Sequence, residues 1–155
     1  MTQVIILTGA IQTGKTTALQ EWLKNKDARG ILSPVVNGLR SLYAIQERIY
    51  IPFESIERTA GTISIGRYHF YQKAFDQANY LLLSKMITGW CIIDEVGPLE
   101  LQEQGFFPAL EKLRKNSKHN LLVVVRSSLL ATVQEKFEWQ HARIITADDL
   151  GTLKA

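Results

Sequence analysis

Residues 9–17 read Gly-Ala-Ile-Gln-Thr-Gly-Lys-Thr-Thr and directly follow the apolar run at 4–7. The glycines keep side chains away from the backbone amides, which can then point at the oxygens of a phosphate chain. Lys15 adds a positive charge, and the helix expected after it directs its positive dipole end at the same anion. The Thr16 hydroxyl can reach a Mg²⁺ ion that bridges the terminal phosphates. We therefore predict Mg²⁺ as cofactor and a loop that binds a nucleoside triphosphate through Gly9, Ala10, Ile11, Gln12, Thr13, Gly14, Lys15, Thr16 and Thr17.

Two adjacent carboxylates, Asp94 and Glu95, follow the continuous apolar run at 90–93. Such a run is typical of a strand buried on both faces, and ligands collect at the carboxyl ends of parallel strands. One carboxylate there can hold Mg²⁺, while its neighbour orients and deprotonates an attacking water. We expect Asp94 to serve the metal together with Thr16 and Glu95 to be the base, on opposite sides of the strand. Helix capping by the acid pair is the alternative, and it is disfavoured because a Gly-Pro pair follows rather than a helix.

The rest of the chain alternates between strand and helix patterns. Apolar runs typical of strands lie at 4–7, 30–33, 90–93, 121–125 and 142–146, and helix-like stripes lie at 17–24, 71–88, 106–113 and 129–137. The acidic pair at 148–149 leads into a short terminal helix or a tail. This order predicts a three-layer α/β fold around a mainly parallel sheet. A length of 155 residues fits a single domain spanning the whole chain.

One region does not fit simple alternation. Residues 42–45 and 49–53 flank a polar turn, and the second segment alternates with period two, as in a β-hairpin. We expect an inserted antiparallel hairpin over about 37–65, with Pro52 on an edge strand. Such an insertion can cover a ligand or serve only as scaffold, and the sequence leaves both roles open.

Composition places the chain among ordinary globular proteins. Hydrophobic residues make up 46% and charged residues 21% of the chain, and the formal net charge is +3. No apolar run is long enough to span a membrane, so we expect a cytoplasmic protein with no membrane partner. The lone Cys91 lies in an apolar strand and is expected in the core. A basic cluster at 112–119 ends a predicted helix, where cations complement the helix dipole, so nucleic acid is a disfavoured partner.

Three segments together resemble a known family: 9–17, the Gly-Arg-Tyr at 66–68, and the run at 93–101 that contains Asp-Glu-Val-Gly-Pro-Leu-Glu. They are similar to the small P-loop nucleoside-triphosphatases related to the human cancer-related nucleoside-triphosphatase. The resemblance implies a P-loop fold of the additional-strand, catalytic-Glu type and slow, Mg²⁺-dependent hydrolysis of ATP, GTP and other nucleoside triphosphates. Because Arg67 lies in the family-like turn, it is our first candidate for stabilising the transferring phosphoryl group, and Arg126 is the alternative.

The chain departs from this family at two places. Gln12 stands where the family loops usually carry a further glycine, and residues 146–149 replace the family's common Thr and basic residue after the last strand. Base contacts at that end are therefore not carried over from the family.

Three other functions compete with hydrolysis. A nucleotide or small-molecule kinase shares the phosphate loop but needs an acceptor pocket and usually a lid with several arginines, of which the insertion offers Arg40, Arg48 and Arg58. A GTPase switch fits the Asp-x-x-Gly at 94–97, but the guanine-reading Asn-Lys-x-Asp is missing. A non-catalytic or nucleic-acid-linked ATPase module working with a partner is the third, and the oligomeric state is not predicted.

Overall fold

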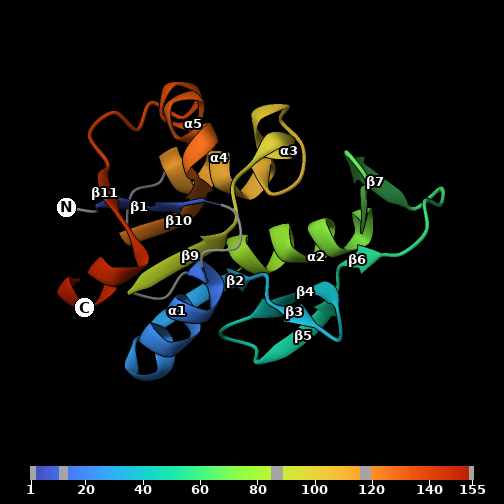
Figure 1. Ribbon diagram of the computed structural model, residues 1–155, viewed down its shortest axis with the longest axis horizontal. Helices are drawn as coiled ribbons and strands as arrows, with labels where there is room; N and C mark the ends of the chain where they lie inside the picture. The colour runs from blue at the N-terminus through green and yellow to red at the C-terminus, as the bar shows by residue number, and fades with distance from the viewer. Residues whose placement is uncertain (1–2, 11–13, 85–88, 116–119, 154–155) are drawn as a thin grey trace.

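The computed structural model of the protein describes residues 3–10, 14–84, 89–115 and 120–153. A mainly parallel sheet carries helices on both faces, and a smaller antiparallel sheet lies at one end of the molecule (Figure 1). This architecture confirms the three-layer α/β prediction.

The parallel part of the main sheet brings the two predicted motifs together. Its strands are, in order across the sheet, β11 (Arg143–Ile145), β1 (Val4–Gly9), β10 (Asn120–Arg126), β9 (Trp90–Asp94) and β2 (Ala28–Leu32). Strand β10 lies between β1 and β9, which is the additional strand that the resemblance implied. Gly9 stands opposite Arg126, and Val124 stands opposite Asp94. The carboxyl ends of β1, β10 and β9 therefore meet at one edge, where ligands of such sheets bind.

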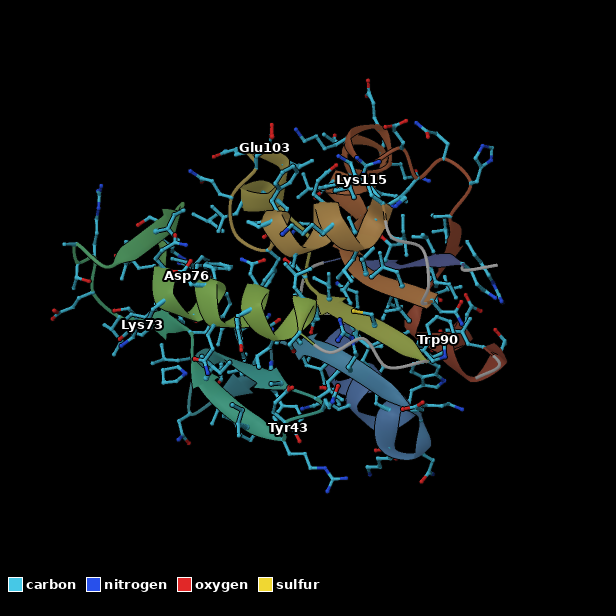
Figure 2. All side chains as sticks on the ribbon, turned by 180° about the vertical axis from the view of Figure 1, so that it is seen from behind. Tyr43, Lys73, Asp76, Trp90, Glu103 and Lys115 are labelled. Atoms are coloured by element: carbon cyan, nitrogen blue, oxygen red, sulfur yellow. The ribbon has the colours of Figure 1, made fainter. Side chains whose placement is uncertain are left out.

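Successive residues of the parallel strands enter two separate cores. Ile6 belongs to one core and its neighbour Ile5 to the other, and both are fully buried. This burial on both faces explains why the strands read as continuous apolar runs. In the second core Trp90 packs edge-on against Trp22, with ring centroids 5.6 Å apart (Figure 2 labels Trp90). The first core is covered by α2 (Gln72–Leu83), α4 (Phe107–Lys115) and α5 (Leu130–Lys136), and the second by α1 (Lys15–Trp22) and the 3₁₀ helix η3 (Ala147–Thr152).

Strands β2 and β9 approach each other closely at Gly30. Gly30 has a φ of 122°, and a Cβ atom at this position would collide with the backbone of Ile92. Only glycine fits there, both for its left-handed backbone and for lack of space. The strand predicted at 30–33 accordingly starts earlier, at Ala28, and passes through this glycine.

The antiparallel region is larger than the predicted hairpin. Strands β4 (Leu39–Ala44) and β5 (Ile49–Pro52) form the expected hairpin, and β4 also pairs with β2 and with β3 (Val35–Val36). Among the described strands β5 pairs with β4, which puts Pro52 on an edge as expected. A second sheet follows from β6 (Glu54–Ser55), β8 (Tyr68–Tyr71) and β7 (Thr62–Ile65). Antiparallel pairing thus extends past residue 65, because 68–71 pairs with both β6 and β7.

Two helix predictions need correction. Helix α2 ends at Leu83 rather than near residue 88, since the Ser84 hydroxyl and amide both donate to the Leu81 carbonyl; residues 85–88 lie outside the described part. A short helix α3 (Pro98–Leu101) was not expected. Its Pro98 occupies the first turn, where the missing N–H costs no hydrogen bond. The Gly-Pro pair that was taken as a sign of no helix therefore starts one.

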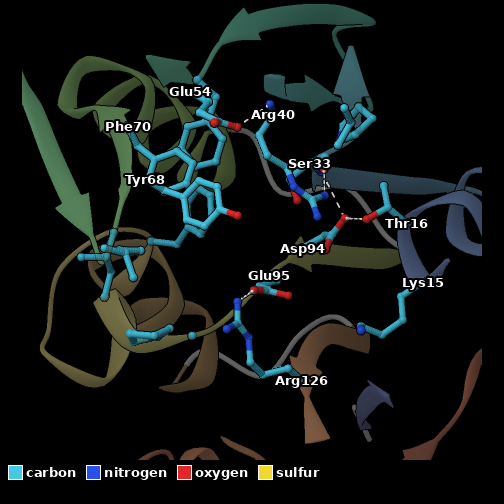
Figure 3. Close-up of a pocket in the computed structure, with 18 of the residues that line it drawn as sticks. Lys15, Thr16, Ser33, Arg40, Glu54, Tyr68, Phe70, Asp94, Glu95 and Arg126 are labelled. Atoms are coloured by element: carbon cyan, nitrogen blue, oxygen red, sulfur yellow. Dashed lines mark hydrogen bonds and ion pairs between the residues drawn. The ribbon is translucent and has the colours of Figure 1, made fainter. Parts of the chain in front are cut away.

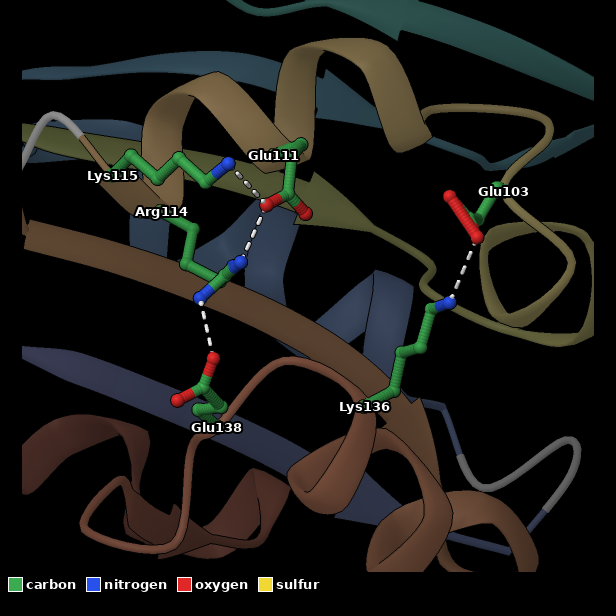
Figure 4. A network of polar contacts seen from close by, with 6 residues as sticks. All are labelled: Glu103, Glu111, Arg114, Lys115, Lys136 and Glu138. Atoms are coloured by element: carbon green, nitrogen blue, oxygen red, sulfur yellow. Dashed lines mark hydrogen bonds and ion pairs between the residues drawn. The ribbon is translucent and has the colours of Figure 1, made fainter.

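Ion pairs on the surface join α4, α5 and the turn after α3 (Figure 4). Glu111 of α4 pairs with Arg114 and with Lys115 (3.1 Å), Arg114 also reaches Glu138 (3.5 Å), and Lys136 of α5 pairs with Glu103 (3.2 Å). Part of the predicted basic cluster is thereby neutralised by acidic neighbours, while its residues 116–119 lie outside the described part. None of the helices in the described ranges has the length and hydrophobicity needed to cross a membrane.

Candidate active site

The phosphate loop connects β1 to α1, as predicted. Gly14 precedes the helix with a φ of 76°, a left-handed conformation that glycine adopts without strain. The Lys15 side chain is buried, and its Nζ donates to the carbonyl oxygens of Ala10 (2.7 Å) and Gly9 (3.3 Å). Lys15, Thr16 and Thr17 line a pocket at the carboxyl edge of the sheet. Ile11, Gln12 and Thr13 of the predicted loop lie outside the described residues.

Asp94 joins the end of β9 to the phosphate loop. The Thr16 hydroxyl donates to Asp94 Oδ2 at 2.7 Å, and the Ser33 amide donates to the same oxygen at 3.1 Å. Burial raises the pKa of Asp94, and the hydrogen bonds from Thr16 and Ser33 oppose that rise. The structure therefore places Asp94 beside Thr16, although the two residues are far apart in the sequence.

Glu95 is the first residue beyond β9, and its carboxylate pairs with a cation from the neighbouring strand. The Arg126 guanidinium, at the end of β10, donates to Glu95 Oε1 at 2.8 Å, and about a third of each side chain is exposed. Because β9 ends at Asp94, the alternation expected on a strand does not extend to Glu95. Asp94 and Glu95 line the same pocket but contact different groups, Thr16 and Arg126, so the expected placement on opposite sides of the strand stays a prediction.

Arg67 lies on the wall of the pocket away from the phosphate loop. Its Nη2 donates to the Tyr68 hydroxyl at 3.0 Å, and its guanidinium lies over the Tyr68 ring, 5.1 Å from the centroid. The hydrogen bond to Tyr68 raises the pKa of Arg67. Of the two arginines weighed from the sequence, Arg126 is the one in contact with Glu95.

The pocket has a volume of about 870 Å³ and runs between two different ends. We call the end formed by Lys15, Thr16, Asp94 and Arg126 the phosphate end. We call the opposite end, lined by Phe53, Ile65, Tyr68, Phe70 and Phe106, the aromatic end. Figure 3 shows Asp94 and Glu95 between Thr16 and Lys15 on one side and Tyr68, Phe70 and Glu54 on the other. The antiparallel insertion therefore contributes a wall of the candidate site.

Sequence reasoning missed several residues that line this pocket. The Arg40 guanidinium donates to the Ser33 carbonyl at 2.6 Å, and its amide donates to Glu54 Oε1 at 2.8 Å. Arg40 had been counted only as a possible lid arginine, and no local pattern marks Glu54. The aromatic end comes from separate strands and loops, so short-range spacing gives no signal for it.

Glu100 is a buried carboxylate that organises the segment after Glu95. It accepts hydrogen bonds from the Gly97 amide at 2.8 Å and from the Phe106 amide at 2.9 Å. Burial raises its pKa to about 7, against the lowering effect of these two amides. The family-like motif included Glu100. Its role as a cap at the start of helix α3 could not be predicted, because that helix was not expected.

The residues at the phosphate end suit a magnesium ion. The described residues contain no group of three or more His, Cys, Asp and Glu side chains arranged to hold a metal. Magnesium bound to a nucleotide needs no such cage, because phosphates and water supply most of its ligands. The Thr16 hydroxyl and the Asp94 carboxylate provide two adjacent hard oxygen atoms beside the loop. This donor set fits the Mg²⁺ that the sequence predicted.

Comparisons with known proteins agree with this geometry. The sequence model of one family, described as NTPase, matches residues 4–149. The chain belongs to this NTPase family. The match includes the phosphate loop, the carboxylate pair and the whole antiparallel insertion, and it supports nucleoside triphosphate hydrolysis as the general class of chemistry. The search for relatives among curated proteins found no match.

Two solved structures share the fold of this family member. The crystal structure of THEP1 from the hyperthermophile Aquifex aeolicus is 22% identical with a TM-score of 0.75, and the match covers 94% of this chain and 90% of that one. The solution structure of a human cancer-related nucleoside triphosphatase is 19% identical with a TM-score of 0.74, and the match covers 98% and 95% of the two chains. At these identities the two structures establish a shared P-loop NTPase fold.

Proposed function

We propose that the protein hydrolyses nucleoside triphosphates such as ATP and GTP to the diphosphate and phosphate, in a reaction that depends on Mg²⁺. The observation that carries the proposal is the contact between Thr16 of the phosphate loop and Asp94, with Glu95 next along the same pocket. A phosphate-binding loop, a metal-binding carboxylate and a second carboxylate in the same pocket are the parts that phosphoanhydride hydrolysis needs. Family membership supports the same class of reaction.

Each residue of the phosphate end has a distinct role in this proposal. Backbone amides of the loop and the Lys15 ammonium bind the terminal phosphates, while Thr16 and Asp94 hold Mg²⁺. When bound, Mg²⁺ neutralises charge on the phosphates as the transition state forms. Glu95 orients a water molecule in line with the terminal phosphorus and accepts its proton.

Arg126 is our preferred candidate for stabilising charge on the transferring phosphoryl group. It lies beside Glu95 at the phosphate end, whereas Arg67 is held on Tyr68 across the pocket. The Arg126 side chain is about a third exposed and lines the pocket, so its guanidinium is accessible to a phosphate oxygen. Arg67, the first candidate from the sequence, stays the alternative.

A phosphate-release assay tests the proposed function. The purified protein is incubated with each of ATP, GTP, CTP and UTP in Mg²⁺, and free phosphate is measured without any acceptor present. We expect release that requires Mg²⁺ and that Lys15→Ala abolishes. Lack of release by the wild-type protein would contradict the proposal, and equal release by Lys15→Ala would trace the activity to a contaminant.

A cytoplasmic location stays a prediction of the sequence.

A further inference from the structure

The pocket continues well beyond the groups that a hydrolase requires. A water nucleophile occupies only about 30 Å³, whereas this pocket measures about 870 Å³ and extends from the phosphate loop to the aromatic end. Ligand-binding pockets for small molecules typically span roughly 300–1,000 Å³. Part of this volume would hold the triphosphate, and the part past Glu95, which the aromatic residues line, is open to a second molecule.

The orientation of the triphosphate fixes what that second molecule can do. Lys15 and Thr16 mark the β and γ phosphates, and Glu95 stands between them and the aromatic end (Figure 3). In phosphoryl transfer the attacking oxygen approaches the γ phosphorus in line with, and opposite to, the leaving oxygen. The aromatic end lies on the Glu95 side, from which the attack comes. A molecule bound there is placed as a phosphoryl acceptor.

The aromatic end has the composition of a site for a flat ring. Phe53 packs against Phe70 with ring centroids 4.5 Å apart, and Phe106 closes the buried side. Tyr68 is 44% exposed and presents its ring beside them. Stacking on aromatic side chains is a common mode of binding for planar rings, including nucleobases. The ligand that fits this wall is planar and at least partly apolar.

Polar groups at the edge of the same wall favour a ligand that carries hydroxyls. The Glu54 carboxylate reaches the pocket and uses Oε1 to accept the Arg40 amide. A carboxylate with further lone pairs can accept a hydrogen bond from a hydroxyl or a ring N–H. The Arg67 guanidinium beside Tyr68 adds a cation that can meet an anionic substituent. These contacts define a hydroxyl-bearing molecule with an aromatic or heteroaromatic ring, the class that includes nucleosides and aromatic alcohols.

We propose that the aromatic end binds such an acceptor and that the protein transfers the γ-phosphoryl group to it. The acceptor hydroxyl oxygen attacks the γ phosphorus and forms a new P–O bond, while the bond between that phosphorus and the β–γ bridging oxygen breaks. Glu95 takes the hydroxyl proton, and the electron pair of the broken bond leaves with the nucleoside diphosphate. Hydrolysis is the same step with water in place of the acceptor. The proposal rests on triphosphate binding as given in the proposed function.

The test follows labelled phosphate from ATP. Wild-type protein is incubated with Mg²⁺ and ATP labelled at the γ position, with each of two sets of probes: the four ribonucleosides, and the aromatic alcohols pyridoxine and tyrosol. Chromatography separates labelled acceptor from labelled free phosphate. We expect at least one set to yield labelled acceptor, and the set that does so distinguishes a nucleoside site from a site for simpler ring alcohols.

Two tyrosine variants localise the acceptor. Tyr68→Ala removes the exposed ring of the aromatic end, and Tyr80→Ala removes a ring that is 74% exposed on α2 and does not line the pocket. We expect Tyr68→Ala to lower the ratio of transferred to hydrolysed phosphate about 10-fold or more, as loss of one stacking contact implies. Tyr80→Ala should keep the wild-type ratio.

The outcomes separate this inference from the proposed function. Free phosphate with no labelled product from any probe would overturn the acceptor site and leave hydrolysis standing. Absence of both products would overturn the two proposals together. Labelled product whose yield is the same in Tyr68→Ala and Tyr80→Ala would show that the acceptor binds outside the aromatic end, which contradicts the inference.

Discussion

The two ends of the pocket are built in different ways. The phosphate end stands on the carboxyl ends of β1, β9 and β10, where hydrogen bonds and an ion pair join Thr16 to Asp94 and Glu95 to Arg126. The aromatic end comes from the antiparallel insertion and the loop before α4, and it is formed mostly by ring contacts. Polar groups fixed on buried strands suit transition-state stabilisation, whereas a ring-lined wall suits selection of a ligand. The difference fits the proposed division of roles, with catalysis at the phosphate end and acceptor binding at the aromatic end.

The largest effect is expected from Lys15→Ala at the phosphate end. Lys15 supplies the side-chain charge of the described loop, and charge-assisted contacts to phosphate are the strong ones. We expect the variant to lose most of the thermal stabilisation that a triphosphate gives the wild-type protein. Lys24→Ala, at an exposed position just after α1, is the matched control and should keep it. Undiminished stabilisation of Lys15→Ala would place nucleotide binding outside the loop.

Asp94→Asn should weaken the binding of Mg²⁺. Asparagine keeps the size of the side chain and can still accept the Thr16 hydroxyl, but it removes the charge that attracts a divalent cation. We expect the Mg²⁺ concentration needed for nucleotide binding to rise about 10-fold or more, within the range seen when metal-site groups are lost. Titration of Mg²⁺ at fixed nucleotide concentration measures this. An unchanged Mg²⁺ requirement would remove Asp94 from the metal site.

The two arginines sharpen the contrast between the ends. Arg126→Ala should slow single-turnover hydrolysis about 100-fold, the usual cost of losing one transition-state donor, with nucleotide affinity nearly kept. Arg67→Ala should leave acceptor-free hydrolysis within about 3-fold, because an exposed contact to Tyr68 contributes little to the transition state. The opposite ranking would return the catalytic role to Arg67 and assign chemistry to the aromatic end.

The smallest effect is expected from Glu100→Gln, and the property that it changes is the pH dependence of the protein's stability. Because its pKa is raised to about 7 in the fold, the folded protein keeps a proton that the unfolded chain loses near its ordinary pKa of 4.5. The stability tied to this proton is therefore fully present below pH 4.5 and is lost as the pH rises to about 7. Glu100→Gln cannot titrate, so the difference in Tm between wild type and variant should change across this range. Parallel curves of Tm against pH for the wild type and Glu100→Gln would contradict the raised pKa of Glu100.

The same contrast explains what could be predicted from the sequence. The phosphate loop, Asp94 and Glu95 stand next to continuous apolar runs, so local pattern and strand-end geometry place them correctly. Helix α3 was missed because its signal is one proline whose role depends on Glu100 capping from inside the turn. The aromatic end was missed for a different reason. Phe53 and Phe106 meet only through tertiary packing of the insertion on the sheet, and no periodicity links them.

The two adjacent carboxylates show most clearly how far the sequence alone can predict the site. The sequence indicated two tasks for Asp94 and Glu95, and strand alternation assigned them to opposite sides. In the structure β9 ends at Asp94, and both groups line one pocket while contacting different partners, Thr16 and Arg126. The division of tasks therefore stays a proposal, and these different partners support it.

The most direct test of the account compares affinity and chemistry in Glu95→Gln. Glutamine keeps the size and hydrogen-bonding capacity of the side chain but cannot accept the proton of the attacking water. We predict that the single-turnover rate of ATP hydrolysis falls about 100-fold or more while the Kd for the triphosphate stays within about 3-fold, since the base acts in the transition state. Hydrolysis by Glu95→Gln at the wild-type rate would show that Glu95 is not the base and would contradict the mechanism at the phosphate end.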